Sequence, residues 1–226
     1  MKRIFTLMVA MAAIATTASA QLQFGVEAGL NVNLPSSFDN ATIKQTVDPK
    51  NSLGWFAGLK AKYQFAMGLG VDGAVLYSQK KNDMGESSKD LRYIDVPINL
   101  RYQLGLGSLL SIYAAAGPQW SVNIGDRDWG RTFSQTIQDQ NLNNVSGTVT
   151  ELYQGALNNL SINLGAGVLL MKHLQVGFTY NIPITKGGEL IYTLPNADPT
   201  SAIDTYNSVK ENWKNNSWQI RATYFF

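Results

Sequence analysis

The chain has 226 residues, 45% of them hydrophobic, with 20 glycines, ten tyrosines, five tryptophans and no cysteine. The lack of cysteine excludes disulfide bridges and a thiol-linked lipid anchor, and the length suits one domain with a large buried or lipid-facing surface. The 18 basic residues include Lys2 and Arg3 of a predicted export signal, so the remaining 16 balance the 16 acidic residues and no nucleic-acid partner is indicated.

Residues 1–20 carry the three regions of a cleavable export signal. A basic start is followed by an apolar run at residues 4–14 and by the small-residue cleavage sequence ASA at residues 18–20. The alternative is an amphipathic or buried first helix. We predict that residues 1–20 are a signal peptide and that residues 21–226 form a single domain.

Alternation of apolar and polar residues dominates the chain after the signal. Between Leu22 and Leu34 every second residue is apolar, which is the period of a β-strand with one apolar face. No run of roughly eighteen apolar residues follows, so no transmembrane helix is predicted. The other segments with this period are residues 53–65, 69–80, 93–104, 109–124, 159–170, 174–184 and 218–226. Each is close to the roughly ten residues with which a tilted strand crosses a bilayer.

The connections between these segments alternate in length, as in an outer-membrane barrel whose termini both face the periplasm. We predict an all-β fold: a transmembrane antiparallel up-and-down β-barrel of eight strands, with four long extracellular loops and three short periplasmic turns. The short turns are residues 66–68, 105–108 and 172–173, and the long loops are residues 35–52, 81–91, 125–157 and 185–215.

Two of the long loops contain sequence that is not typical of irregular connections. Residues 148–153 and 190–194 either extend the neighbouring strands or form an extra hairpin, so the number of strands stays open. Apolar residues at near-helical spacing up to Trp213 favour a short surface helix behind a cap at Thr200 or Ser201.

Aromatic residues on the outward face form a second pattern. Threading the strands up and down places them in two girdles, one near the short turns and one near the long loops, as expected at membrane–water interfaces. A soluble barrel is the alternative, but the polar face carries little charge for a surface in water. The girdle residues are Phe24, Trp55, Tyr63, Phe65, Tyr77, Tyr102, Trp120 and Tyr180, together with Trp218, Tyr224 and Phe226.

Charged residues on the inward face predict a network in the lumen. Such groups need opposite charges nearby to offset their desolvation, and eight strands leave an interior that side chains nearly fill. The favoured interpretation is a salt-bridged structural plug, and the alternative is a gate whose rearranged pairs let small ions through. The network comprises Glu27, Lys60, Lys62, Asp72, Lys80, Asp95, Arg101 and Arg221.

The sequence motifs that could carry catalysis give little support for enzymatic activity. Residues 68–73 match a dinucleotide-binding glycine pattern but lead into an alternating strand instead of a helix. Asp126 and Asp128 lack the rest of a calcium loop. His173, the single histidine, falls in a predicted periplasmic turn, whereas enzymatic outer-membrane barrels commonly place a general-base histidine near the outer rim. We predict no catalytic residues, no cofactor and no metal site.

Three stretches resemble the small porin-family outer-membrane β-barrel proteins of Gram-negative bacteria, which share the architecture of OmpX and of the OmpA barrel. They are AGLN at residues 28–31, YIDVPINLRY at residues 93–102 and WQIRATYFF at residues 218–226. The resemblance covers the whole chain after the signal and implies a location in the bacterial outer membrane, in contact with its lipid. It also implies a terminal signal that the barrel-assembly machinery reads. That signal consists of Trp218, Ile220, Tyr224 and Phe226.

Three functions are compatible with these observations. The favoured one is a structural barrel that has a mostly side-chain-filled lumen and presents loops 125–157 and 185–215 to an extracellular ligand or protein. The first alternative is a low-conductance porin for small solutes. The second is a soluble lipocalin-like carrier of an apolar ligand.

Overall fold

The computed structural model describes residues 21–35, 51–83, 88–107, 109–138, 144–194 and 207–226. This part of the chain is all-β apart from one short 3-10 turn, η1 (Ala66–Gly68). None of its helical segments has the length and apolarity to cross a membrane. The strands are β1 (Gln21–Pro35), β2 (Ser52–Gln64), β3 (Leu69–Asp83), β4 (Ser88–Gly105), β5 (Leu110–Asn123), β6 (Asp128–Gln138), β7 (Asn144–Gly155), β8 (Asn158–Leu170), β9 (Leu174–Pro183), β10 (Gly188–Leu194), β11 (Asn207–Trp213) and β12 (Asn215–Phe225).

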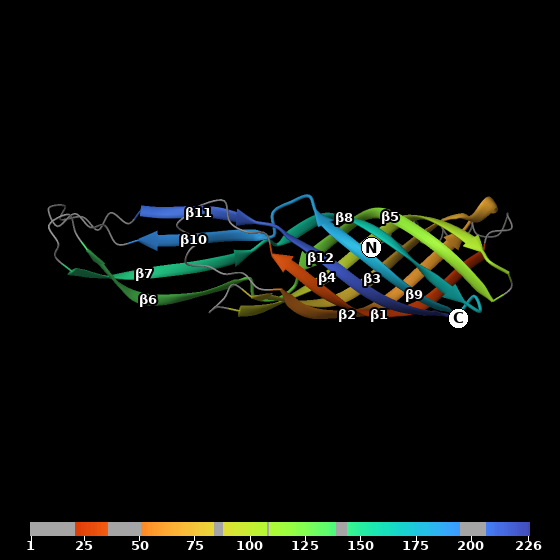
Figure 1. The fold of residues 1–226 in the computed structure, drawn as a ribbon, viewed down its shortest axis with the longest axis horizontal. Helices are drawn as coiled ribbons and strands as arrows, with labels where there is room; N and C mark the ends of the chain where they lie inside the picture. The colour runs from red at the N-terminus through yellow and green to blue at the C-terminus, as the bar shows by residue number, and fades with distance from the viewer. Residues whose placement is uncertain (1–20, 36–50, 84–87, 108, 139–143, 195–206) are drawn as a thin grey trace, which may run out of the picture.

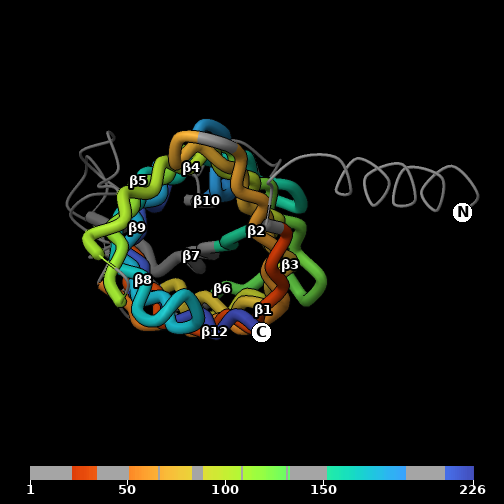
Figure 2. Tube along the Cα trace, turned by 90° about the vertical axis from the view of Figure 1, so that its right-hand side faces the viewer, coloured from red at the N-terminus to blue at the C-terminus, as the bar shows by residue number. Residues whose placement is uncertain are grey.

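Eight of these strands close into a barrel in the order β1-β12-β9-β8-β5-β4-β3-β2. Each barrel strand pairs antiparallel with the barrel strands that precede and follow it along the chain. The first strand, β1, and the last, β12, pair with each other. Figure 1 shows the barrel from the side, and Figure 2 shows it as a ring viewed from the end with the short turns. The predicted antiparallel up-and-down barrel of eight strands is confirmed.

The first and last strands complete the ring. β1 and β12 pair without a break in register from Gly25 opposite Phe225 to Pro35 opposite Asn215. Hydrocarbon offers no hydrogen-bond partner to an unpaired backbone group, so a closed ring is the arrangement that satisfies every strand edge. The aromatic-rich stretch at residues 218–226 thus belongs to the strand that seals the barrel.

The short turns form where the sequence predicted them, with one shift. The turn between β8 and β9 spans residues 171–173, one residue earlier than expected, because Met171 and Lys172 both adopt positive φ angles, 50° and 65°. Two successive residues with positive φ form a type I′ turn, whose twist matches that of the flanking strands. His173 follows this turn, and its backbone amide donates to the Leu170 carbonyl.

Two hairpins extend beyond the barrel. The chain between β5 and β8 forms the hairpin β6–β7, and the chain between β9 and β12 forms the hairpin β10–β11. β7 pairs with β10 from Gly155 opposite Gly188 to Thr150 opposite Thr193, which joins both hairpins into a four-stranded sheet of order β11-β10-β7-β6. We call it the outer sheet. Figure 1 shows it projecting from the end of the barrel opposite the short turns.

The outer sheet replaces much of what the sequence predicted as irregular loops. Strands do form over residues 148–153 and 190–194, within β7 and β10, and they belong to the outer sheet and not to the barrel. The predicted surface helix is wrong for residues 207–213, which form β11, and its earlier part lies outside the described residues. Pairing with β10 overrides the weak local helical pattern, because tertiary context commonly outweighs intrinsic propensity.

The two other long loops differ from each other. β3 and β4 remain paired as far as Asp83 opposite Ser88, so the predicted loop at residues 81–91 is mostly a continuation of that hairpin. The predicted loop at residues 35–52 lies mainly outside the described residues, apart from its first and last positions.

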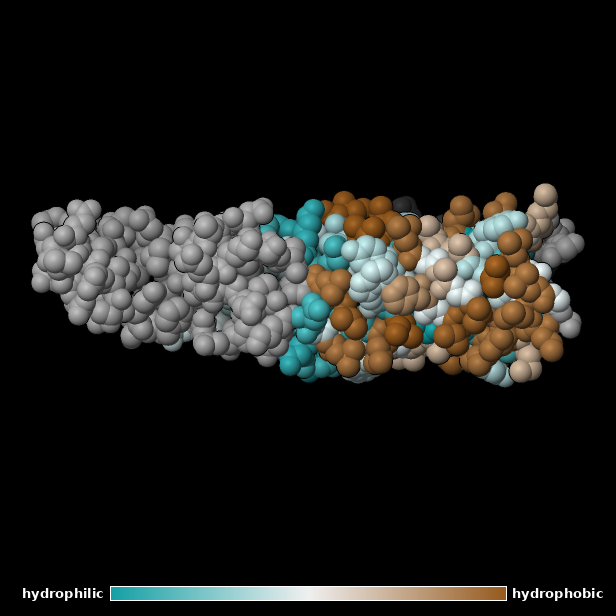
Figure 3. Space-filling model, viewed as in Figure 1, coloured by the Kyte–Doolittle hydropathy of each residue, from teal (hydrophilic) through white to brown (hydrophobic). Residues whose placement is uncertain are grey.

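The outward face of the barrel is apolar. Leu59, Leu100 and Ile98 are 66%, 61% and 58% exposed, and Figure 3 shows hydrophobic residues over much of the barrel, with a hydrophilic band at the end next to the outer sheet. Soluble monomers rarely expose contiguous apolar surface of this extent. The exposure and its boundary fit a barrel set in hydrocarbon.

A charge at mid-height on this face is expected to destabilise the barrel. Leu59 lies on β2 midway between the girdle residues Trp55 and Tyr63, so Leu59→Arg should lower the free energy of unfolding by about 2–4 kcal/mol in lipid vesicles. Leu53→Arg is the matched control near the loop end of the same strand and should cost about 0–1 kcal/mol. Urea titration followed by tryptophan fluorescence measures both, and equal losses would contradict the assigned depth.

Candidate functional site

The lumen of the barrel is filled by inward-facing side chains in three regions. We name them the charge layer, toward the short turns, the vestibule above it, and the aromatic lid at the base of the outer sheet. The side chains of the charge layer are at most 4% exposed. The charge layer consists of Glu27, Lys60, Lys62, Asp72, Arg101 and Arg221.

Glu27 is a junction between three strands. Its carboxylate on β1 accepts hydrogen bonds from Lys60 Nζ on β2 at 2.8 Å, and from Arg221 Nη1 at 3.2 Å and Thr223 Oγ1 at 2.7 Å on β12. A buried carboxylate is tolerated when ion pairs and hydrogen bonds replace its hydration. The same contacts that compensate this charge also hold the two sides of the barrel seam together.

Asp72 and Arg101 form the second junction of the charge layer. Asp72 lies 3.5 Å from Arg101 Nη1 and 3.6 Å from Lys60 Nζ, and it accepts a 2.9 Å hydrogen bond from Asn99. Arg101 donates from Nη1 to Gln175 Oε1 at 2.6 Å, which reaches across the lumen from β4 to β9. The charge layer is therefore cross-linked across the barrel and not only between adjacent strands.

Tyr113 fills the space next to Arg101. The guanidinium carbon lies 3.8 Å from the centre of the Tyr113 ring, a distance typical of a cation–π contact. The phenol passes over Gly177, where a Cβ would collide with the Tyr113 hydroxyl. Glycine at this inward position makes room for the ring, which helps to close the lumen at this height.

The remaining predicted pair lies above the charge layer. Lys80 Nζ is 3.1 Å from Asp95, which also accepts a 2.7 Å hydrogen bond from Ser78 Oγ. Lys80 lies over the ring of Tyr93 at 4.8 Å. The structure thus places all eight predicted network residues inside the barrel, but it divides them between two levels.

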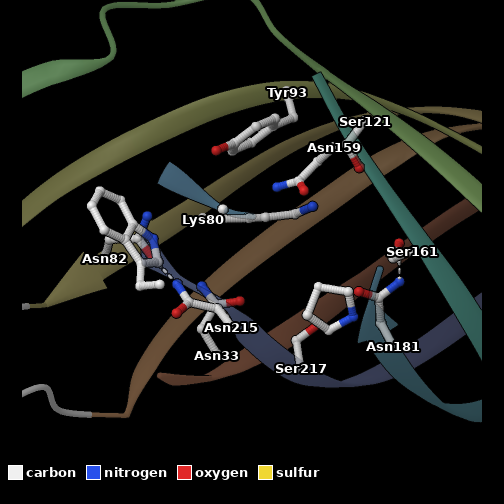
Figure 4. Close-up of a pocket in the computed structure, with 13 residues that line it drawn as sticks. Asn33, Lys80, Asn82, Tyr93, Ser121, Asn159, Ser161, Asn181, Asn215 and Ser217 are labelled. Carbon is white, nitrogen blue, oxygen red and sulfur yellow. Dashed lines mark hydrogen bonds between the residues drawn. The ribbon is translucent and has the colours of Figure 1, made fainter. Parts of the chain in front are cut away.

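The vestibule is a cavity of about 50 Å³ lined mainly by amide and hydroxyl side chains (Figure 4). Asn181 Nδ2 donates to Ser161 Oγ and to Asn163 Oδ1, both at 2.7 Å, and Asn215 Nδ2 donates to Asn82 Oδ1 at 2.8 Å. Its volume accommodates a few water molecules. The vestibule is a polar, mostly uncharged space between the charge layer and the aromatic lid.

The aromatic lid is a buried apolar cluster that sequence reasoning missed. Trp129 stacks on Tyr153 with ring centroids 5.5 Å apart, and Trp213 packs edge-on against Trp129 at 5.8 Å. The Trp213 indole lies where a Cβ of Gly188 would sit, so this glycine permits the packing. The cluster joins strands of the outer sheet to the barrel strand β4. Its members are Leu91, Tyr93, Trp129, Tyr153, Leu190 and Trp213.

The predicted girdle residues lie on the outer surface. Phe24, Phe65, Tyr102 and Trp120 are exposed, whereas Tyr63, Tyr77 and Tyr180 are partly covered. Trp55 and Tyr77 pack together at 5.5 Å, and Trp218 stacks on Phe178 at 4.7 Å. Trp218, Ile220, Tyr224 and Phe226 also point outward, and their role as an assembly signal stays a prediction.

His173 has a structural contact at the short-turn end. Its Nδ1 lies 2.8 Å from the carbonyl oxygen of Phe225, and the Phe225 amide donates to the His173 carbonyl at 2.8 Å. These contacts tie the last barrel strand to the β8–β9 turn. The described residues contain no group of three or more His, Cys, Asp or Glu side chains placed to hold a metal ion.

The family model for the outer membrane protein beta-barrel domain matches residues 4–226. The chain belongs to this family. It is an outer-membrane β-barrel protein, and the family places it in the bacterial outer membrane. Family membership does not favour the soluble lipocalin-like alternative.

Several solved structures are similar to the chain. OprG from Pseudomonas aeruginosa is 15% identical, covering 92% of this chain and 98% of that one with a TM-score of 0.45. Ail, the attachment invasion locus protein of Yersinia pestis, is 16% identical, with coverages of 91% and 99% and a TM-score of 0.40. The outer membrane enzyme PagL is 14% identical, with coverages of 86% and 97% and a TM-score of 0.41. No curated protein matches the chain.

Removal of the more buried tryptophan of the aromatic lid should loosen the outer sheet without opening the barrel. Trp213 is 1% exposed, so Trp213→Ala should cost about 3–5 kcal/mol, taken from the local stability of β10 and β11. Hydrogen exchange in lipid nanodiscs should show faster exchange there and unchanged exchange in β1 and β12. Trp120→Ala, on the lipid-facing surface, is the control and should leave the outer sheet protected. Equal protection in both variants would contradict the role of the lid.

Proposed function

We propose that the protein is a non-conducting membrane anchor that holds the outer sheet outside the membrane for contact with other molecules. The observation that supports this proposal is the pairing of β7 with β10, which joins two hairpins into one sheet seated on the aromatic lid. Unpaired hairpins of this length are marginally stable in water, whereas four paired strands packed on an apolar cluster form an ordered surface.

The filling of the lumen supports the non-conducting part of the proposal. The vestibule and a smaller cavity of about 10 Å³ beside Lys60, Asp72 and Arg221 share no lining residue. Asn163, which lines the smaller cavity, is buried and joined to the buried Gln119 by a 3.0 Å hydrogen bond. A solute crossing the barrel would have to break these contacts and those of the charge layer.

The outer sheet supplies the surface that an extracellular ligand or protein would contact, since its strands come from residues 125–157 and 185–215. Among the described residues, β6 and β11 are the outermost strands of this sheet. β6 pairs with β7 over eleven residues in continuous register, contains no proline and is an end strand of the sheet. Because a long end strand without proline accepts an added strand, β6 is the side on which we place a partner.

A low-conductance porin is the second candidate, and one observation favours it. The lumen is lined by polar side chains and holds two cavities, so a rearrangement of the charge layer would create an aqueous path. In that case the ion pairs of Arg101 and Glu27 act as a gate instead of a plug.

Residues 1–20 act as a cleaved export signal, and the assembly machinery reads Trp218, Ile220, Tyr224 and Phe226 at the end of β12. The proposal includes no catalytic step, because His173 lies at the short-turn end in contact with Phe225, away from the outer rim.

Conductance separates the two candidates. In planar lipid bilayers we expect the wild-type protein to give no discrete current steps, since the charge layer closes the lumen. Arg101→Ala removes a side chain that links Asp72, Gln175 and Tyr113, and it should produce small steps. Arg92→Ala, an exposed position outside the lumen, should stay silent. Regular steps from the wild type would support the porin, and a silent Arg101→Ala would show that the charge layer does not close the lumen.

A further inference from the structure

Each short turn of the barrel carries an exposed apolar side chain at its tip. Met67 is 89% exposed in the turn between β2 and β3, and Met171 is 67% exposed in the turn between β8 and β9. In the turn between β4 and β5, Leu106 and Leu109 are 54% and 66% exposed. The Met171 amide donates to the Leu109 carbonyl at 2.7 Å, so two of the turns lie side by side. We call these four side chains the turn tips.

The backbone of two of these turns does not favour methionine. Met67 and Met171 have φ angles of 62° and 50°, and each is followed by a second residue with positive φ, Gly68 or Lys172. Two-residue turns with this backbone favour Asn followed by Gly, because the left-handed region is costly for most residues that carry a Cβ. Methionine therefore stands at two positions where asparagine would suit the backbone better, which points to a role for its side chain.

The turn tips continue the lipid-facing surface of the barrel wall. Figure 3 shows hydrophobic residues reaching the short-turn end, whereas the hydrophilic band lies at the opposite end of the barrel. Among the described residues of the three short turns, Lys172 is the one formally charged side chain. The wall residues that flank the turns are apolar and exposed as well, and they are Phe65, Leu69, Leu104 and Leu174.

The length of this apolar surface sets the depth of the turn tips. On the strand β2 and the residue that follows it, exposed apolar side chains run from Leu53 to Phe65. At about 3.3 Å per residue and a tilt of about 40° this span covers roughly 30 Å, whereas the apolar band of an outer-membrane barrel is about 25 Å tall. Met67 follows Phe65, so the tips fall at the level of the lipid headgroups. Water is still present there to satisfy the backbone groups of the turns.

We propose that the turn tips insert into the adjacent leaflet of the outer membrane, at the boundary between headgroups and acyl chains, and anchor the short-turn end of the barrel in phospholipid. Apolar side chains bind at this boundary in proportion to the apolar area that they bury. The occupant is lipid because the tips are continuous with the wall that already faces lipid. The proposal concerns the short-turn end alone and does not depend on the role of the outer sheet.

Spin labels test the position of the tips in the membrane. The chain has no cysteine, so an introduced cysteine carries a label at one known position. Met67→Cys, Leu106→Cys and Met171→Cys are labelled in phospholipid vesicles, and collisions with oxygen, which partitions into lipid, are compared with collisions with a water-soluble nickel complex. Each label should meet oxygen more often, and nickel less often, than a label at Arg92→Cys, an exposed position near the opposite end of the barrel. Leu59→Cys on the wall is the lipid-facing reference.

Two results would overturn the proposal. Nickel collisions as frequent as those of Arg92→Cys would place the tips in water. Rare collisions with both reagents would show that the tips are covered by protein, either a second copy of the chain or another partner.

Asparagine separates the role of the side chain from that of the backbone. Met67→Asn combined with Met171→Asn suits the left-handed backbone but removes both apolar tips. If the tips contact lipid, the urea midpoint of this double variant in phospholipid vesicles should fall below that of the wild type. Lys172→Asn is the matched control, since it changes a residue of the same backbone conformation without removing an apolar tip, and it should keep or raise the midpoint. A double variant at least as stable as the wild type would contradict insertion.

Discussion

Charge compensation of Glu27 inside the lumen is the interaction on which the rest of the barrel depends. Its carboxylate on β1 contacts Lys60 on β2 and both Arg221 and Thr223 on β12, so one buried group joins the three strands around the seam. Continuous backbone pairing of β1 with β12 closes the ring, and the carboxylate fixes its register from the inside. The outward apolar face and the inward charged face are therefore held in place by the same closure.

The narrowness of an eight-stranded barrel explains what lies above the seam. Inward side chains nearly fill such an interior, so charges have to pair across it, as Arg101 does with Asp72 and Gln175. Above this level amide side chains enclose the vestibule, and Trp129 and Trp213 cover it. The lid belongs both to the barrel, through β4, and to the outer sheet, which gives the two parts a common apolar core.

The sequence predicted the barrel well because its signal is local. Alternation with a period of two assigns every strand residue to a face, and it placed Glu27, Asp72 and Arg101 in the lumen and Leu59 in the lipid. The outer sheet could not be predicted in this way, because the pairing of Tyr153 on β7 with Leu190 on β10 joins segments far apart in the chain. Which charges pair is also a non-local question, so the position of Lys62 over the Phe225 ring emerged only from the structure.

The energetic coupling between Glu27 and Arg221 tests the central claim most directly. A double-mutant cycle with Glu27→Gln and Arg221→Gln, measured as free energies of unfolding in lipid vesicles, reports whether the two residues act as a unit. Glu27→Gln leaves Arg221 without its carboxylate, and Arg221→Gln removes one of the two cations that compensate Glu27. We therefore expect the double variant to be more stable than the sum of the single losses predicts, by about 1–3 kcal/mol. Additive losses would show that the seam does not depend on this pair and would contradict the account.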